Sequence, residues 1–325
     1  MPIRFDALAV VSAAALLSAC DEVSYVTDPS GPNALNIGTT SIAQSPSGLP
    51  FATGQSLGDL NERYALIGRL VRFETDWTSE RSTIVVDEEV IEISFVADED
   101  FLSAITLNGQ TYELIESDGR YEAELPNGQI LTVESAGNTA VVGILNVYSY
   151  SDFLDTGFDT DGFIVLGLQT NPGELPQTPG TVIYRGSVFG FGNRFDQDGA
   201  YLSDGERFDG TAEIDVRFAD GEVSGTYLEL GLTSVEGSPA AFFSGNGAPI
   251  VGNGFADTMS IIQGACPEMT TCSGTVLIGG AFFGADAEEL AGNVGVDYTI
   301  ISTETDLGER FVGAGAFVAD PVLPP

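Results

Sequence analysis

Short runs in which apolar and polar side chains alternate, separated by Asn-Gly and Asp-Gly pairs, recur along this 325-residue chain. In one run Ala212, Ile214 and Val216 alternate with charged residues, and Asp220-Gly221 follows it. Alternation with a period of two gives a β-strand one apolar face and one polar face. Asx-Gly pairs supply the positive φ angles of hairpin turns. The pattern therefore predicts an all-β, antiparallel fold.

Residues 57–170 are predicted to form an N-terminal antiparallel β domain, built as a meander. Runs such as 91–95 alternate, and three turn pairs separate the later ones: Asn108-Gly109, Asp118-Gly119 and Asn127-Gly128. One short helix is expected before the first strand, over 59–73, with Asp59 as its N-cap. This helix is predicted from apolar residues at helical spacing, which are Leu57, Leu60, Tyr64, Ile67 and Val71.

Residues 171–180 contain three prolines and are the clearest linker in the chain, because proline lacks the N–H that a β-ladder needs. A second domain is predicted over 181–325. It contains eight candidate strands, at 181–189, 210–218, 222–232, 240–244, 255–262, 275–283, 293–301 and 311–319. Eight such strands can close into a small barrel that has no free edge. A membrane-spanning barrel would need an outward apolar face with aromatic girdles, and these runs are too short and irregular for that.

The charge composition argues against several classes of function. The chain has 11 basic and 48 acidic residues, a formal net charge of -37, no histidine and no lysine. A Ser-His-Asp relay and a His-rich zinc site need histidine, and a Schiff base or a P-loop needs lysine. The negative charge repels phosphate backbones, so nucleic acid is not an expected partner. We therefore expect a soluble, acidic, Gly-rich β protein without a cofactor, and not an enzyme.

Residues 1–20 predict where the protein resides. Arg4 precedes an apolar stretch that is too short to cross a bilayer but suits a signal peptide. The stretch ends in Leu17-Ser18-Ala19-Cys20, which resembles a bacterial lipobox, so Cys20 is the expected site of a lipid anchor in the membrane. An ordinary signal peptide with an incidental cysteine and a buried core helix are the alternatives. Asp21 leaves the choice between inner and outer membrane open, and residues 21–56 are expected to be a flexible tether.

The two cysteines that remain, Cys266 and Cys272, are expected to form a structural disulfide, because an exported chain meets oxidising conditions. The loop between them is short, so the bond would stiffen one local turn more than the whole fold. A redox-active or metal-binding pair is the alternative, but it would need a tighter spacing or two further ligands.

A glycine-rich and aromatic stretch begins at residue 279. It reads Gly279-Gly280-Ala281-Phe282-Phe283-Gly284-Ala285-Asp286-Ala287-Glu288-Glu289-Leu290-Ala291-Gly292. This stretch resembles the signature of the β-barrel domain of transferrin-binding protein B, to which factor H-binding protein is a more distant relative. The signature positions are Gly280, Phe282, Phe283, Gly284, Ala287, Glu288, Glu289 and Gly292. Other stretches match in order, which are 180–186, 216–225 and 252–255 in the barrel, and 162–168 before it in short, single-lobed members.

The residues of the signature also have a structural interpretation of their own. Gly284 permits a sharp exit from a strand, and Asp286 or Ala285 can begin a single helical turn. Glu288 and Glu289 lie near the start of that turn, where the helix dipole favours negative charge. A catalytic carboxylate pair is the alternative, but adjacent residues do not face each other on a helix and nothing nearby would raise one pKa.

Two other groups of residues suggest binding sites. Two sets of aspartates resemble fragments of calcium loops without the full spacing, and solvated turns are the preferred interpretation over weak calcium binding: Asp155, Asp159 and Asp161, and Asp196, Asp198 and Asp204. Aromatic residues with one arginine flank a Gly-rich loop between the first two barrel strands. The candidate ligand-loop residues are Phe191, Arg194, Phe195 and Tyr201, although packing in the core is the preferred alternative for most of these rings.

The resemblance implies an eight-stranded antiparallel barrel of the transferrin-binding protein B type. It also implies a lipid-anchored envelope protein, in the outer membrane and exposed at the surface, that binds a protein or iron-carrier ligand through loops at the barrel end. Known two-lobed members work with a transporter and an iron-carrying host protein, whereas this chain is expected to have one lobe. A small-solute carrier with its ligand inside the barrel and a structural lipoprotein without a ligand are the alternatives.

Overall fold

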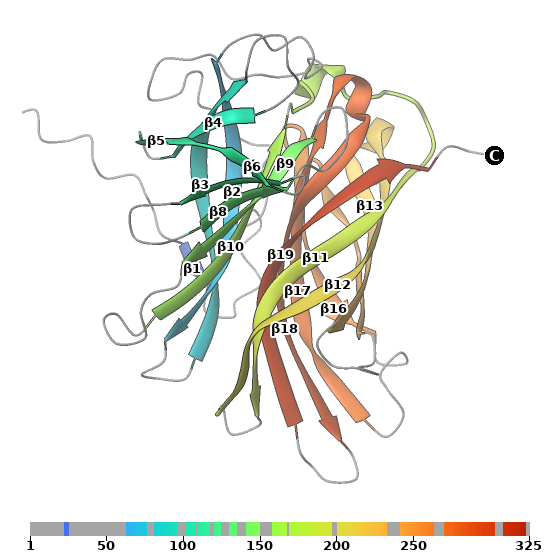
Figure 1. The fold of residues 1–325 in the computed structure, drawn as a ribbon. Helices are drawn as coiled ribbons and strands as arrows, with labels where there is room; N and C mark the ends of the chain where they lie inside the picture. The colour runs from blue at the N-terminus through green and yellow to red at the C-terminus, as the bar shows by residue number, and fades with distance from the viewer. Residues whose placement is uncertain are drawn as a thin grey trace, which may run out of the picture.

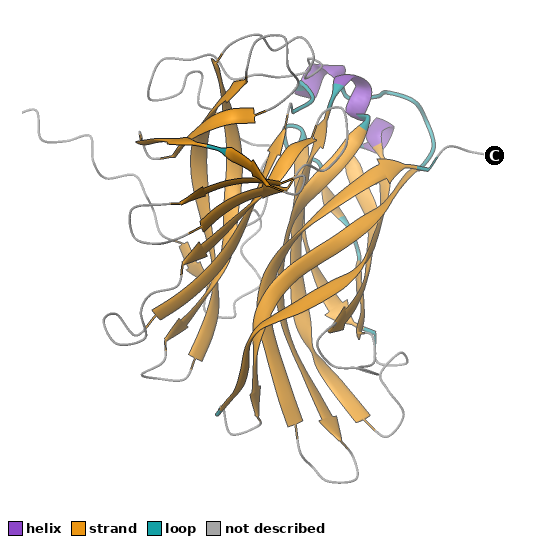
Figure 2. Ribbon diagram, in the orientation of Figure 1, coloured by secondary structure: helices purple, strands orange, loops and turns teal. Residues whose placement is uncertain are grey.

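The fold is that of a computed structural model of the 325-residue chain. It describes residues 23–25, 63–76, 81–95, 102–107, 110–117, 120–124, 130–134, 141–149, 158–167, 169–196, 200–232, 241–262, 270–302 and 308–322. Two antiparallel sheets lie side by side, one curled and one closed into a barrel (Figure 1). Short 3-10 turns lie at the upper end of the barrel in Figure 2, which are η2 (Pro172–Glu174), η3 (Phe218–Asp220) and η5 (Ala285–Ala287). No helix within these ranges is long and apolar enough to cross a membrane.

The first sheet follows the order β5-β4-β3-β2-β10-β9-β8-β7-β6, and β1 pairs with β3. Its strands are β1 (Val23–Tyr25), β2 (Arg63–Asp76), β3 (Arg81–Phe95), β4 (Leu102–Leu107), β5 (Gln110–Glu113), β6 (Ile115–Ser117), β7 (Arg120–Glu124), β8 (Ile130–Glu134), β9 (Val141–Ser149) and β10 (Phe158–Gly167). Two residues separate β4 from β5, and two separate β6 from β7. These are Asn108-Gly109 and Asp118-Gly119, so two of the three predicted hairpins are confirmed as tight turns. The third turn pair, Asn127-Gly128, lies between β7 and β8, which pair with each other.

The first sheet contains two meanders, whereas the sequence predicted one. Strands β2 to β5 form one meander, strands β6 to β10 form a second, and pairing of β2 with β10 joins the two. Only Leu114 separates β5 from β6, yet these two strands lie at opposite ends of the strand order. The sheet must therefore curl until its two edges approach each other at Leu114.

The helix predicted over 59–73 is wrong. Arg63–Asp76 is β2, which pairs with β3 along its whole length and with β10 over its second half. A short apolar run does not distinguish a helix from a strand inside a sheet by its spacing alone. Gly68 lies in the middle of the run and disfavours a helix, and two neighbouring strands supply the hydrogen-bonding partners that a strand needs.

A paired strand also lies within the predicted flexible tether, 21–56. Val23–Tyr25 form β1 and pair with residues 84–86 of β3, so the prediction is wrong for these three residues. Valine and tyrosine suit a strand, and the prolines and glycines that suggested a tether begin only after them. The rest of this segment and Cys20 lie outside the described residues.

The second sheet closes into an eight-stranded antiparallel barrel, because β12 pairs with both β11 and β13. Its strands are β11 (Val182–Asp196), β12 (Tyr201–Arg217), β13 (Glu222–Leu232), β14 (Ala241–Gly245), β16 (Gly254–Ile261), β17 (Thr270–Phe283), β18 (Glu289–Ser302) and β19 (Gly308–Pro321), with the short β15 (Ala248–Pro249) beside β13. The eight predicted strands are confirmed in their order. Several are longer than predicted, and β11 continues to Asp196.

Aromatic rings pack tightly inside the barrel. The most buried phenylalanines there are Phe208, Phe243, Phe255, Phe282 and Phe317. Glycines on neighbouring strands make room for such rings: a Cβ atom on Gly190 would lie 2.3 Å from the ring of Phe208, and one on Gly192 would lie 2.5 Å from the ring of Phe311. The two rings are 5.8 Å apart and perpendicular. The described interior is therefore a packed core.

Candidate functional site at the two ends of the barrel

The two ends of the barrel differ in composition. Strand β11 carries Tyr184 near one end and Arg194 near the other, which at about 3.3 Å per residue are separated by about 33 Å of strand. We call the end that contains η5 the signature end. The end that contains Arg194 is the charged end.

At the signature end, hydrogen bonds to main-chain carbonyl groups hold a strained turn. Gly284 has a φ of 79° and a ψ of -179°, a conformation that only glycine adopts readily. Asp286 and Ala287 follow with φ values of 58°, in the left-handed region. The Tyr184 hydroxyl donates to the carbonyl oxygen of Ala287 at 2.7 Å, and the Thr170 hydroxyl donates to that of Gly284 at 2.7 Å. Burial raises the pKa of Tyr184, so its hydroxyl stays a donor.

The signature residues serve the packing of this turn. Phe282 points into the barrel, where its ring lies 4.9 Å from that of Phe218. Phe283 belongs to the apolar cluster on the outer face. Gly280 and Gly292 lie on neighbouring strands where the backbones approach closely.

A single 3-10 turn, η5, lies at the expected place, but Asp286 within it has left-handed angles, with a φ of 58° and a ψ of 23°. Glu288 and Glu289 follow the turn, so the predicted dipole interaction at its start is wrong.

The two glutamates of the signature lie on different surfaces. Glu288 is exposed, and Glu289, the first residue of β18, is 4% exposed. Glu288 ends η5 with helical φ and ψ angles of -64° and -23°, whereas Glu289 begins the strand. The arrangement does not bring the two carboxylates together, which agrees with a structural role for this pair.

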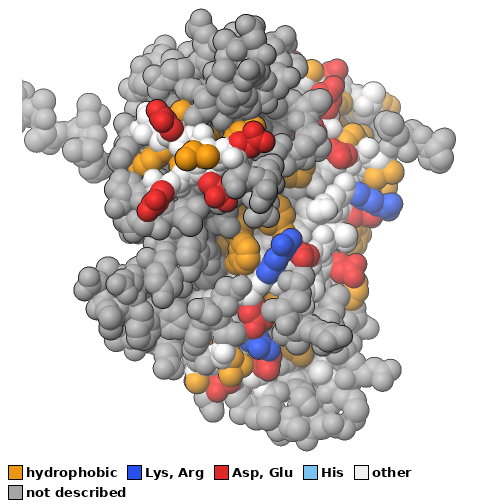
Figure 3. All heavy atoms as spheres, viewed as in Figure 1, with side chains coloured by type: hydrophobic (Ala, Val, Ile, Leu, Met, Phe, Trp, Pro, Cys, Tyr) orange, Lys and Arg blue, Asp and Glu red, His pale blue; other side chains and the backbone are white. Residues whose placement is uncertain are grey.

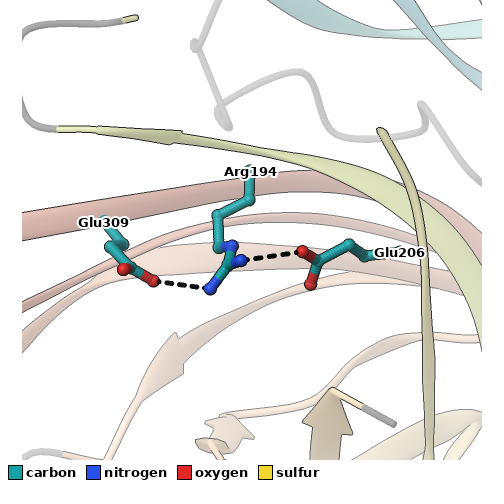
Figure 4. A network of polar contacts seen from close by, with 3 residues as sticks. All are labelled: Arg194, Glu206 and Glu309. Carbon is teal, nitrogen blue, oxygen red and sulfur yellow. Dashed lines mark hydrogen bonds and ion pairs between the residues drawn. The ribbon is translucent and has the colours of Figure 1, made fainter. Parts of the chain in front are cut away.

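At the charged end, Arg194 lies between two glutamates that point into the barrel (Figure 4). Its guanidinium lies 3.0 Å from the carboxylate of Glu206 on β12 and 3.1 Å from that of Glu309 on β19. The side chains of Arg194, Glu206 and Glu309 are 23%, 6% and 56% exposed. The pairing of β11 with β12 shifts register at Arg194, and bulges of this kind occur at the rims of barrels. The cluster therefore connects three adjacent strands at the rim.

Aromatic residues lie directly beneath these charges. Tyr298 is 5% exposed, and its ring lies 5.6 Å from that of Phe311. Burial raises the pKa of Tyr298, and the negative charges of Glu206 and Glu309 raise it further. The Tyr298 hydroxyl therefore stays protonated below this rim.

The structure places three of the four candidate ligand-loop residues in strand β11. Phe195 is 2% exposed, and the ring of Phe191 stacks on Phe163 of the first sheet at 6.1 Å. Arg194 is held in the cluster described above, and the side chain of Tyr201 lies outside the described residues. The prediction of a loop at 191–195 is wrong because β11 is longer than expected, and the preferred alternative of packed rings holds for Phe191 and Phe195.

The free outer face of the barrel pairs positive with negative charges, as the adjacent blue and red side chains in Figure 3 indicate. Arg185 pairs with Glu213, Arg207 with Asp209, and Arg217 with Glu222. These arginine side chains are 58%, 54% and 46% exposed. Such exposed pairs contribute little to stability. They keep this face from being uniformly acidic.

Most of the aspartates in the two groups that resemble calcium loops lie outside the described residues, either entirely (Asp155 and Asp198) or in their side chains (Asp159, Asp161 and Asp204). Within the described ranges alone, no cluster of three His, Cys, Asp or Glu side chains could hold an ion. Asp196 accepts a hydrogen bond from the main-chain N–H of Ala200 at 2.8 Å, which is a turn contact. Cys272 is 4% exposed and disulfide-bonded. Cys266 lies outside the described residues, so its pairing with Cys272 stays a prediction.

The sequence did not predict most of the residues that form the contacts at the two ends of the barrel. Glu206 and Glu309 keep the alternating phase of the inward residues Phe208 and Phe311. A charged residue at a core position of a strand is a detectable signal, but it requires the true strand length. Nothing in the local sequence of Thr170 indicates its bond, because its acceptor is 114 residues away.

The barrel matches one known family. Residues 175–319 match the family model for the C-lobe and N-lobe beta barrels of Tf-binding protein B. The resemblance expected from the signature is therefore confirmed for the barrel. No curated protein matches the chain.

The solved structures that resemble this chain include structures of transferrin binding protein B. A double mutant of transferrin binding protein B from Haemophilus parasuis Hp5 is 17% identical with a TM-score of 0.44, over 80% of this chain and 45% of that one. The protein from serogroup B Neisseria meningitidis is 15% identical with a TM-score of 0.39, over 87% of this chain and 56% of that one. The chain thus spans about half the length of these proteins.

Proposed function

Because residues 175–319 form a barrel of the transferrin-binding protein B type, we propose that this protein is a lipid-anchored binding protein of the bacterial cell envelope. It resembles one lobe of transferrin-binding protein B and binds a protein or iron-carrier ligand. We place it in the outer membrane, with the folded part exposed at the surface. The family match of the barrel is the observation that carries this proposal.

The packing of the barrel favours a ligand bound outside it. Aromatic rings packed over glycines of neighbouring strands occupy the described interior, where a small-solute carrier would need room for its ligand. One side of the outer face packs against the first sheet. The free outer face and the ends of the barrel are therefore the surfaces on which a partner would bind.

A binding experiment with defined probes tests the ligand class. The mature chain without its lipidated Cys20, residues 21–325, is immobilised, and iron-loaded and iron-free transferrin are passed over it in surface plasmon resonance. A parallel pull-down against envelope proteins and other iron carriers identifies partners by mass spectrometry, and each hit is re-measured as a purified protein. Saturable binding to one of these supports the proposal. If every purified probe fails to bind, the structural-lipoprotein alternative is favoured.

The lipid anchor is tested separately at Cys20. The Cys20→Ser variant should appear in the soluble fraction, whereas the wild-type protein should sediment with membranes. Protease treatment of intact cells should digest the wild-type protein if it is exposed at the surface. Continued sedimentation of the variant would contradict lipidation, and full protection from protease would contradict surface exposure.

A further inference from the structure

Strands β2, β3 and β10 of the first sheet all approach β18 or β19 of the barrel. Among the described residues, three sets of contacts between the sheet and the barrel lie within eight residues of the chain, 163–170. The first set follows the end of β10. Gln169 forms an isolated antiparallel bridge with Phe283 at the end of β17. The Thr170 N–H donates to the carbonyl oxygen of Phe282 at 2.8 Å, and its hydroxyl donates to that of Gly284. The chain leaving the sheet is thus paired with the barrel before the linker begins.

The second set is an apolar contact between β10 and the outer face of the barrel. Phe163 and Val165 are both fully buried. The ring of Phe163 stacks on that of Phe191 and meets Phe189 edge-on at 5.9 Å. Small residues on the barrel wall let the sheet approach it closely. These residues are Ala281, Ala291, Ala314 and Ala316.

The third contact is a single buried amide. Asn293 on β18 is fully buried, and its Nδ2 donates to the carbonyl oxygen of Phe163 at 2.9 Å. Its Oδ1 is buried without a hydrogen-bond partner among the described residues. A buried polar group costs free energy unless it is bonded. If the sheet slid along the barrel, Asn293 would lose its remaining bond, so this residue favours one position of the sheet.

From these contacts we propose that Thr170 and Asn293 clamp the first sheet onto the barrel, so that the two unfold together as one cooperative body. In this proposal the strained signature turn supplies the acceptor on the barrel, because the carbonyl oxygen of Gly284 accepts the hydrogen bond from the Thr170 hydroxyl. The inference is independent of the ligand and of the membrane anchor.

Calorimetry and hydrogen exchange of the mature chain test the clamp. The wild-type protein should show one thermal transition. In the double variant Thr170→Val with Asn293→Leu, both side chains keep about their size but lose their donors. The first sheet should then unfold at a lower temperature in a separate transition. Amides of β2 and β10 should exchange about tenfold faster or more, whereas amides of β17 and β18 should keep their protection.

Thr226→Val is the matched control, because Thr226 is fully buried inside the barrel and its hydroxyl bonds Asp257 at 2.8 Å. This variant should lower the transition temperature and keep a single transition. Two transitions in the wild-type protein would overturn the proposal. So would a single transition in the double variant with parallel exchange in both sheets. If the double variant does not fold, the two single variants are compared in the same way.

Discussion

The two ends of the barrel are stabilised by different kinds of interaction. At the signature end, neutral hydroxyl groups of Tyr184 and Thr170 donate to main-chain carbonyl groups. At the charged end, Arg194 bonds the carboxylates of Glu206 and Glu309. Neutral hydrogen bonds suit the signature end, where the chain from the first sheet excludes water. Charges suit the rim, because Glu309 is 56% exposed and remains hydrated.

This difference means that the two ends should respond differently to salt and to substitution. Ionic strength screens exposed and half-exposed charges, and it leaves neutral buried hydrogen bonds nearly unchanged. Each variant below is measured by urea unfolding of the mature chain at low and at high salt. The packed middle of the barrel serves as a reference for both ends.

Gly190→Ala in the packed middle should have the largest effect. The new Cβ would lie 2.3 Å from the carbonyl oxygen of Ala314 and 2.7 Å from Cα of Gly315, and backbone atoms cannot move aside as a side chain can. We expect a loss of about 3 kcal/mol in the free energy of unfolding at either salt concentration. Gly231→Ala is the control, since its Cβ would meet nothing within 4 Å. A loss in the control as large as in Gly190→Ala would contradict the packing argument.

Arg194→Met should have the next largest effect, about 2 kcal/mol at low salt, because it leaves Glu206 buried without its cation. The difference from wild type should shrink at high salt. Arg185→Met is the control: Arg185 is 58% exposed and pairs with Glu213, so its loss should cost less than about 0.5 kcal/mol. Equal losses in both variants would remove the distinction between the rim and the outer face.

Tyr184→Phe should cost about 1 kcal/mol, because the buried carbonyl oxygen of Ala287 loses its donor. This loss should be the same at low and high salt, in contrast to Arg194→Met. Tyr227→Phe should change nothing measurable, since Tyr227 is 46% exposed on the outer face. A salt-dependent loss in Tyr184→Phe would show that the signature end is not held by neutral contacts.

Asp286→Gly should have the smallest effect and the opposite sign. Asp286 is exposed and has a φ of 58°, so glycine relieves strain and should stabilise the protein by about 0.5 kcal/mol. The neighbouring Ala285→Gly lacks this relief and should destabilise it by a similar amount. If both variants destabilise equally, the turn stores no strain at Asp286.

The barrel strands were predictable, because alternation and Asx-Gly turns specify strands locally. The strands predicted at 222–232 and 275–283, for example, coincide with β13 and with the second part of β17. The wrong prediction of a helix at 59–73 depended on a weaker signal, the spacing of apolar residues in one short run. Its strand, β2, is determined by pairing with β3 and β10, whose residues lie elsewhere in the sequence.

The contacts at the two ends were less predictable than the strands. The sequence predicts a ligand-binding loop around Arg194, whereas its observed partners are Glu206 and Glu309. Glu309 is 115 residues away from Arg194, and Ala287 is 103 residues away from the hydroxyl that bonds it. Such pairs depend on the register of strands around a closed barrel, which alternation along one strand does not contain.

Pairing between β2 and β10 has a consequence for how this architecture can change. These strands are the first long strand and the last strand of the curled sheet, and they run antiparallel beside each other. The chain therefore enters and leaves the sheet on the same side, as an inserted cassette does. Recombination could exchange the intervening strands, or lengthen them, without rerouting the chain into β11. The barrel would keep its entry point while the unit before it diverged.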